Sequence, residues 1–196
     1  YLAKDELPKL IRAAGELNDA PIYIDETPNI RMLEIRSKAR RHMSQNPCHL
    51  VIIDYMQLMS GDRRAENRQV EISEISRGIK GLARELKVPI LALSQLSREA
   101  ERDDTGTPKL SHLRESGSIE QDADVVMFLY RPPEGKTPQA ENLIKLQVAK
   151  HRNGPTDKFD LLFLKDYQRF ENIAKDVNET SATMAEDDSF EDDTPF

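Results

Sequence analysis

A single carboxylate follows a short apolar run in the first third of the chain. Residues 50–53 are Leu-Val-Ile-Ile, and the next residue is Asp54. A short apolar run without alternation is typical of a strand buried on both faces of a parallel sheet. Ligands bind at the carboxyl ends of such strands, and an Asp there can support the Mg²⁺ of a bound nucleotide. The same residue could instead cap a turn or helix after the strand.

A second apolar run ends in an amide. Residues 88–94 are Val-Pro-Ile-Leu-Ala-Leu-Ser, and Gln95 follows them. A neutral amide can donate a hydrogen bond to a phosphate oxygen and accept one from water, so it can report whether a terminal phosphate is present. The alternative role is a glutamine that only satisfies the backbone groups of a loop.

Two cations end a third strand. In a strand of period two, alternate residues share a face, so the pattern predicts that apolar and basic side chains line up on one side. The residues of this face are Ile144, Leu146, Val148, Lys150 and Arg152. Cations at the end of a buried face can stabilise phosphate charge. They can equally be surface residues whose stems pack on apolar neighbours.

Strands and helices alternate along the chain, which predicts an α/β fold with a mostly parallel sheet flanked by helices. The sequence around residues 153–156 (Asn-Gly-Pro-Thr) predicts an antiparallel hairpin at the edge of that sheet. The expected helices are 4–18, 30–45 and 68–87, and the expected strands are 21–25, 50–53, 88–95, 123–130, 143–152 and 158–165.

The net negative charge of the chain is concentrated at its C-terminal end. The 196 residues carry 28 basic and 35 acidic side chains, and eight of the acidic ones lie in residues 176–196, which hold no Lys or Arg. We therefore expect one domain, residues 1–175, that can accept an anionic partner, followed by a disordered acidic tail, 176–196. One cysteine, no apolar span and no signal pattern predict a cytoplasmic protein with no membrane contact.

Five linked motifs resemble the motor domain of bacterial DnaB-type replicative DNA helicases, from about residue 4 to Ala174. The motifs are Ile-Ile-Asp-Tyr-Met-Gln-Leu-Met (52–59), Arg-Gly-Ile-Lys-Gly-Leu-Ala-Arg-Glu-Leu (77–86), Pro-Ile-Leu-Ala-Leu-Ser-Gln-Leu-Ser (89–97), Leu-Arg-Glu-Ser-Gly-Ser-Ile-Glu-Gln-Asp-Ala-Asp (113–124) and Lys-His-Arg-Asn-Gly-Pro (150–155). The resemblance implies a RecA-like core that assembles as a homo-hexamer around single-stranded DNA and hydrolyses ATP with Mg²⁺.

The resemblance also implies roles for the nucleotide-binding candidates. Asp54 matches the Walker B aspartate that supports Mg²⁺, and Gln95 matches the glutamine that senses the γ-phosphate. Lys150 and Arg152 match the basic pair that reaches the nucleotide of a neighbouring subunit. These four residues are our expected catalytic and ATP-binding set.

The expected DNA contacts come from a different segment. Arg114, Glu115 and Gly117 match a loop that lines the central channel of the ring. Arg114 would pair with a phosphate, Glu115 would position it, and Gly117 would let backbone N–H groups approach. The arginine loop, residues 61–67, together with Arg68, is a second candidate channel segment, although a solvated loop explains it equally well.

One family motif is missing from the printed sequence, which has no Gly-x-x-x-x-Gly-Lys-[Ser/Thr]. The resemblance implies that this P-loop and the general base lie upstream of Tyr1, so we expect the chain to begin inside the motor domain and to be inactive alone as an ATPase. Primase and a helicase loader are implied partners of the intact protein. The alternative functions are a RecA-type or circadian-clock-type ATPase, and a nonenzymatic DNA-binding or hexamer-interface module.

Overall fold

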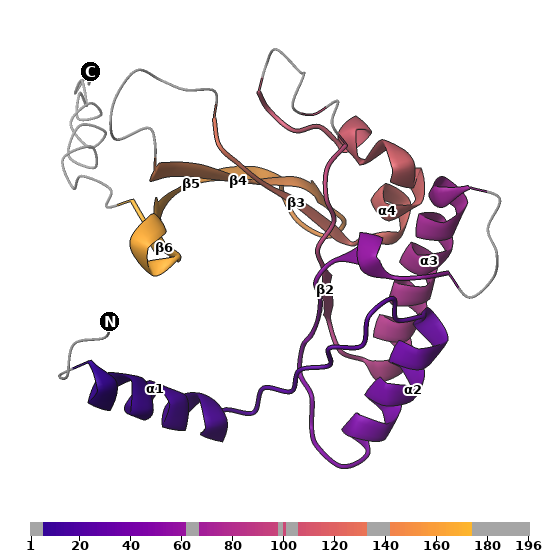
Figure 1. Ribbon diagram of the computed structural model, residues 1–196. Helices are drawn as coiled ribbons and strands as arrows, with labels where there is room; N and C mark the ends of the chain where they lie inside the picture. The colour runs from indigo at the N-terminus through magenta and orange to yellow at the C-terminus, as the bar shows by residue number, and fades with distance from the viewer. Residues whose placement is uncertain (1–5, 62–66, 98–99, 101–105, 133–141, 174–196) are drawn as a thin grey trace, which may run out of the picture. The chain divides into compact units, whose positions relative to one another are not determined.

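The computed structural model describes residues 6–61, 67–97, 100, 106–132 and 142–173, without the side chains of 114–116. The chain divides into two compact units, Tyr1–Ser94 and Gln95–Phe196. The first unit holds the long helices and a parallel strand pair, and the second holds an antiparallel sheet with short helices (Figure 1).

In the first unit, two short strands pair in parallel. The paired residues run from Val51 opposite Ile90 to Ile53 opposite Ala92, which confirms the expected parallel strands at their centres. Their expected burial on both faces is wrong in the described part of the chain, because Ile52 and Leu91 are 58% and 42% exposed. The elements of this unit are α1 (Leu7–Asp19), α2 (Met32–Met43), β1 (Val51–Ile53), the 3-10 turn η1 (Met56–Leu58), α3 (Arg68–Leu86) and β2 (Ile90–Ala92).

Helix α3 forms as its apolar spacing predicts. Four residues of the stripe are buried, namely Ile72, Ile75, Ile79 and Leu82, because apolar residues three and four apart lie on one side of a helix. Asn67 caps the N-terminus by accepting a hydrogen bond from the backbone N–H of Val70 at 2.9 Å. Lys87 ends the helix in the left-handed conformation, with φ of 55°.

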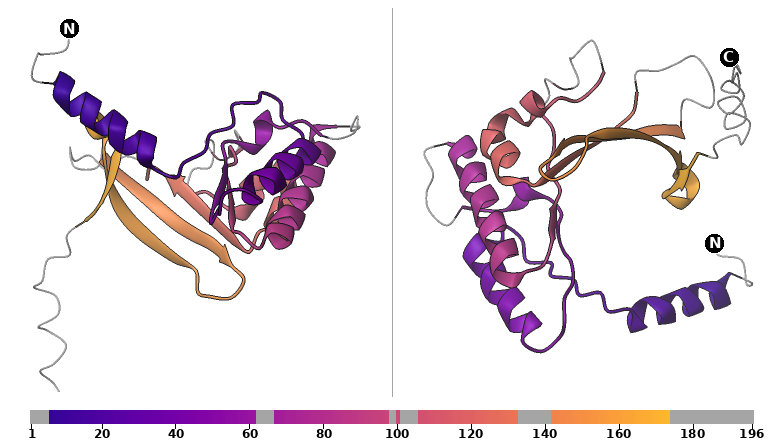
Figure 2. Two further views of the ribbon diagram at one scale, coloured as in Figure 1. Left: turned by 90° about the horizontal axis from the view of Figure 1, so that it is seen from below. Right: turned by 180° about the vertical axis from the view of Figure 1, so that it is seen from behind.

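Helices α2 and α3 lie side by side in all three views (Figures 1 and 2). Their approach depends on Gly78, since a Cβ atom there would lie 2.8 Å from Cγ of Met32. Met32 is buried at this contact. Glu85 of α3 forms ion pairs with Arg36, at 3.3 Å, and with Arg40. The contact between the two helices is therefore apolar at one end and ionic at the other.

The strand expected at residues 21–25 is wrong in the described part of the chain. These residues are outside any strand, and the side chains of Ile22, Tyr23 and Ile24 are exposed. An alternating pattern predicts extended backbone, but a strand also needs a neighbouring edge with which to exchange hydrogen bonds. The apolar residues of α1 are exposed as well, although the helix itself is confirmed.

The second unit contains more antiparallel pairing than the sequence predicts. Strand order is β3-β4-β5-β6, and each pair is antiparallel. The expected β4–β5 hairpin is confirmed, but β3 also joins this sheet, and β6 extends it. The elements are η3 (Leu110–Ser116), α4 (Gly117–Asp122), β3 (Val125–Tyr130), β4 (Leu143–His151), β5 (Asp157–Leu164), η5 (Lys165–Tyr167) and β6 (Arg169–Asn172).

The core of the second unit lies where η3 and α4 meet one face of β3. Leu113, Val126 and Phe128 are buried together, and Leu96 and Ile119 pack against them. This cluster holds the backbone that leads from Gln95 against the segment that carries residues 114–117. Within the described residues, no helix is long and apolar enough to cross a membrane.

Candidate nucleotide and DNA site

The carboxyl ends of β1 and β2 adjoin. The backbone N–H of Leu93 donates to the carbonyl of Ile53 at 2.9 Å, and that of Met56 donates to the carbonyl of Leu93 at 3.0 Å. Asp54 leaves β1 at this edge, with an exposed side chain and a cis peptide bond to Tyr55. The expected placement of a carboxylate at the carboxyl end of paired parallel strands is therefore present.

The donor chemistry of this edge fits a magnesium ion only in part. A carboxylate oxygen is the hard ligand that Mg²⁺ prefers, and Mg²⁺ in nucleotide sites is held by one or two carboxylates plus substrate phosphates. Across the described ranges, no group of three or more His, Cys, Asp or Glu residues could hold a metal ion. Asp54 would thus contribute to an ion that arrives with a nucleotide.

Gln95 begins the second unit, with an exposed side chain. The next residue, Leu96, packs on the cluster of Leu113, Val126 and Phe128. The backbone N–H of Ser97 then donates to the carbonyl of His112 at 3.1 Å. The segment after Gln95 is therefore fixed to η3, the element that carries Arg114.

The expected DNA contacts lie at the junction of η3 and α4. Gly117 is the first residue of α4, and its backbone is right-handed, with φ of −51°. A Cβ atom added there would meet nothing within 4 Å, so the fold itself tolerates a side chain at this position. The side chains of Arg114 and Glu115, and residues 62–66 of the arginine loop, lie outside the described residues.

The shared face expected for Val148 and Lys150 is wrong, because β4 contains a bulge. Lys150 pairs with Val126, whereas Val148 pairs with Met127, so Ala149 is an extra residue. Paired residues of an antiparallel sheet point to the same face, and neighbours along a strand point to opposite faces. One extra residue therefore moves Lys150 to the face opposite Val148.

The bulge directs Lys150 to the end of helix α4. Its ammonium group donates to the carbonyl of Glu120 and, at 2.9 Å, to the carbonyl of Ala123. The last carbonyls of a helix lack partners within the helix and carry partial negative charge, so a lysine stabilises them. Lys150 thus caps the same short helix that begins at Gly117.

Arg152 is tied to the residue that follows this cap. Its backbone N–H donates to the carbonyl of Asp124 at 2.8 Å, and its guanidinium lies 3.4 Å from a carboxylate oxygen of Asp124. The two side chains are 47% and 55% exposed. An ion pair this exposed contributes at most about 1 kcal/mol, so the guanidinium can turn toward another anion at little cost. Sequence reasoning missed Asp124 because no pattern marks the partner of an exposed cation.

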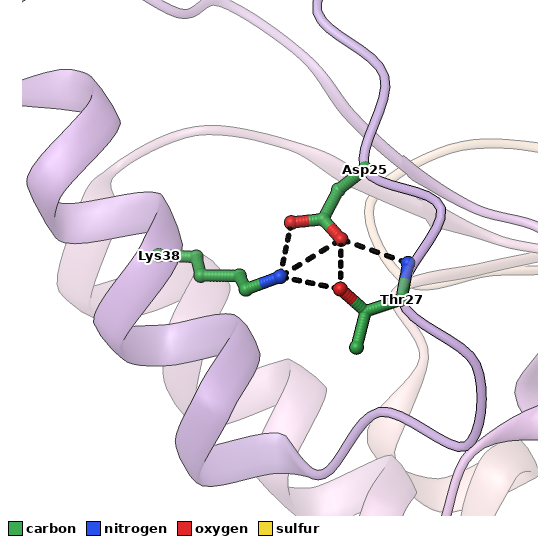
Figure 3. Close-up of polar contacts among 3 residues, drawn as sticks. All are labelled: Asp25, Thr27 and Lys38. Atoms are coloured by element: carbon green, nitrogen blue, oxygen red, sulfur yellow. Dashed lines mark hydrogen bonds and ion pairs between the residues drawn. The ribbon is translucent and has the colours of Figure 1, made fainter.

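A polar cluster outside the expected site fixes the extended segment to α2 (Figure 3). The Lys38 ammonium donates to both carboxylate oxygens of Asp25, at 2.9 and 2.6 Å, and to the Thr27 hydroxyl at 2.5 Å. Thr27 donates to Asp25 through its hydroxyl at 2.6 Å and its backbone N–H at 3.0 Å. These bonds lower the pKa of Asp25 from 3.8 to about 2, with the Lys38 bond the largest cause.

Replacing Lys38 should raise the pKa of Asp25. The Lys38→Met variant removes the bond that most favours the charged carboxylate, while both Thr27 donors remain. We expect the Asp25 titration, followed by carboxyl carbon NMR, to move up toward 3.8 without reaching it. Because the folded-state pKa is lowered, the stability from Asp25 is present above pH 3.8 and is lost as pH falls toward 2. The matched control is Lys9→Met, and an Asp25 titration still near 2 in Lys38→Met would contradict this cause.

Comparison with known proteins agrees with this arrangement. Residues 1–172 match the family described as DnaB-like helicase C terminal domain. The replicative DNA helicase DnaB of Geobacillus stearothermophilus is 48% identical over 180 residues, which is 91% of this chain and 40% of the relative. The DnaB of Leifsonia xyli is 52% identical over 162 residues, which is 82% of this chain and 35% of the relative. The chain thus spans about 40% of the first of these two relatives.

Solved structures show the same fold. A DnaB-like replicative helicase, determined with its interactions with primase, aligns with a TM-score of 0.81 at 40% identity, covering 88% of this chain and 42% of that one. A separately solved ATPase domain aligns with a TM-score of 0.83 at 40% identity, covering 88% of this chain and 62% of that one. The fold is the mixed α/β fold of RecA-like ATPase domains, and the chain belongs to the family of DnaB-like helicase C-terminal domains.

Proposed function

We propose that this chain is part of the motor of an ATP-dependent replicative DNA helicase, acting in a homo-hexameric ring that moves on single-stranded DNA and unwinds duplex. The observation that carries the proposal is the pair of adjoining strand ends. They place Asp54 beside the backbone that runs through Ser94 into Gln95, in a chain of a helicase family. A primase partner is part of the proposal, since a similar helicase has been determined with primase.

In this proposal, Asp54 holds the Mg²⁺ of a bound ATP, and the ion, when present, neutralises charge on the phosphate oxygens. Gln95 contacts the terminal phosphate through its amide. Loss of that contact would change the position of η3, because Leu96 packs against that element and Ser97 is hydrogen-bonded to it. The nucleotide state would thus reach the segment that carries Arg114, Glu115 and Gly117.

Lys150 and Arg152 act on the nucleotide of a neighbouring subunit in this proposal. Each is held by a modest interaction in the isolated chain, Lys150 by two carbonyls and Arg152 by an exposed carboxylate. Phosphate oxygens carry more charge than carbonyl oxygens and form stronger hydrogen bonds. Lys150 would therefore leave the α4 cap when a neighbouring phosphate is within reach, which ties that contact to the helix beginning at Gly117.

The proposal is tested by unwinding. Full-length protein that contains this domain should separate a forked duplex when ATP and Mg²⁺ are supplied, and should not do so with a nonhydrolysable ATP analogue. The ring would be verified in the same samples by sedimentation. Intact rings that hydrolyse ATP in response to single-stranded DNA, yet never separate strands, would argue against a helicase and favour the RecA-type alternative.

Removing the proposed phosphate contact should weaken DNA binding in a salt-dependent way. In the full-length protein, Arg114→Ala should lower the slope of log K against log salt by about one phosphate contact per engaged subunit. Gly117→Ala should weaken binding with the slope unchanged, because it alters no charge. The fold has room for the added methyl group, but the methyl group would keep a phosphate from approaching the backbone closely. Fluorescence anisotropy with labelled oligo-dT at several salt concentrations measures both. An unchanged slope in Arg114→Ala rings would show that Arg114 does not contact a DNA phosphate.

A further inference from the structure

The turn after Asp54 is bonded to the end of the neighbouring strand through one side chain. Gln57 lies in η1, and its side-chain N–H donates to the hydroxyl of Ser94 at 2.9 Å in a half-buried setting. Ser94 directly precedes Gln95 in the sequence. Gln57 therefore contacts the side chain of the residue that precedes the one proposed to sense the terminal phosphate.

The backbone of the same residue is bonded to helix α3. The guanidinium of Arg68 donates to the carbonyl of Gln57 at 2.5 Å and to the carbonyl of Met59 at 3.4 Å. It also forms an ion pair with Glu71 on the next turn of the helix. A guanidinium is planar and always charged, so it suits a site with several fixed acceptors. Arg68, whose side chain is 39% exposed, thus binds three acceptors of its own chain.

Glu71 connects Arg68, which follows the arginine loop, to Gly61, where the loop begins. Its second carboxylate oxygen accepts a hydrogen bond from the backbone N–H of Gly61 at 2.7 Å. That N–H is the largest cause of the lowered pKa of Glu71, and the bond from Arg68 lowers it further. Gly61 enters the arginine loop and Arg68 immediately follows it, so one helical turn holds both ends of the loop.

The turn itself is held firmly. Met56 begins it and Met59 follows it, and each of these residues is only 3% exposed. The backbone N–H of Met56 also bonds to the carbonyl of Leu93. A short turn pinned at both sides can shift only as a whole, since packed interiors have few voids to absorb a local movement. Ser94, Gln57, Arg68, Glu71 and Gly61 thus form one continuous chain of hydrogen bonds and ion pairs.

We propose that Gln57 is a positioning residue that couples the strand end before Gln95 to Arg68 and Gly61, the residues on either side of 62–66, with Arg68 bridging acceptors of its own chain and not binding a DNA phosphate. This inference rests on the proposed function, and it adds residues that the nucleotide and DNA sites themselves do not include. It also gives Gly61 and Arg68 a role in contacts within the chain.

The test compares the basal ATPase rate, which reports catalysis, with the DNA-stimulated rate, which reports coupling. ATP turnover of the full-length protein is measured with and without saturating single-stranded DNA, for wild type, Gln57→Leu, Ser94→Ala and Ser94→Thr. We expect Gln57→Leu to keep the basal rate within about twofold and to lower the DNA stimulation by about fivefold or more, in the range of typical couplings between sites. Ser94→Ala should act alike, since it removes the acceptor, and Ser94→Thr, which keeps a hydroxyl, should restore stimulation.

Three further variants complete the test. Gln69→Ala changes an exposed glutamine on the first turn of α3 and should leave the stimulation unchanged. The double variant Gln57→Leu/Ser94→Ala should lose no more than either single variant, because both remove the same bond. Arg68→Ala should leave the salt slope of DNA binding unchanged, whereas a phosphate ligand would lower it by about one.

Several outcomes overturn the inference. Equal losses of basal and stimulated rate in Gln57→Leu, or a Ser94→Thr variant no better than Ser94→Ala, would reduce the bond to a structural contact. A lower salt slope in Arg68→Ala would make Arg68 a DNA ligand. A wild-type protein without any DNA-stimulated turnover would overturn the proposed function first, and the coupling with it.

Discussion

Arg152→Ala should lower DNA-stimulated ATP turnover of the full-length protein by about 10³-fold or more while leaving nucleotide binding nearly intact. A guanidinium that acts across a subunit boundary mainly stabilises charge on the transferring phosphate, so its loss is felt in the transition state. The exposed pair with Asp124 holds Arg152 too weakly to explain a loss of this size. Turnover would be measured by phosphate release, and binding by fluorescent nucleotide titration.

Mixed rings identify the subunit on which Arg152 acts. Arg152→Ala subunits combined with Asp54→Asn subunits should recover part of the activity, because each defect would lie on a different side of the proposed interface. Asp124→Asn is the matched control, since it removes the partner within the chain and keeps the guanidinium. Verified mixed rings without recovery, or an Asp124→Asn variant as inactive as Arg152→Ala, would show that Arg152 acts inside its own subunit.

Asp54→Asn should abolish ATP hydrolysis in the same protein. The amide keeps the shape of the carboxylate but removes its charge, so the proposed Mg²⁺ ligand is lost. Charge stabilisation by a bound metal ion contributes several kcal/mol to such reactions, which corresponds to at least about 10³-fold in rate. Phosphate release at increasing Mg²⁺ concentrations measures both the loss and any recovery.

The control for this variant is Asp19→Asn, which changes an exposed carboxylate at the end of α1. It should leave the rate and the Mg²⁺ dependence as in wild type. Full activity of Asp54→Asn at ordinary Mg²⁺ would mean that Asp54 is only a turn residue after β1. A partial loss that high Mg²⁺ reverses would instead support a weakened ion site.

Local patterns predict the positions of single helices and strands in this fold. The spacing of Ile72, Ile75, Ile79 and Leu82 predicts α3, and the apolar run before Asp54 predicts β1. The stripe of α3 is buried because apolar residues at helical spacing share one face. The run before Asp54 predicts the position of β1 but not its burial, since Ile52 at its centre is 58% exposed.

Features that depend on the partner of a strand were not predictable in the same way. The run at β3 predicts a buried strand, but its antiparallel pairing with β4 is set by distant residues. The bulge at Ala149 breaks the two-residue period on which the shared face of Val148 and Lys150 was based. The partners of Arg152 and Gln57 are likewise polar residues whose proximity arises only on folding.

The thioether side chains around the turn after β1 have a chemical consequence. Met56 and Met59 are almost wholly buried, so an oxidant reaches their sulfur atoms only when this turn opens locally. Conversion to the sulfoxide makes the side chain polar and disfavours its return to an apolar pocket. Oxidative damage at these two residues would therefore accumulate in molecules that open often, and it would keep the turn from closing again.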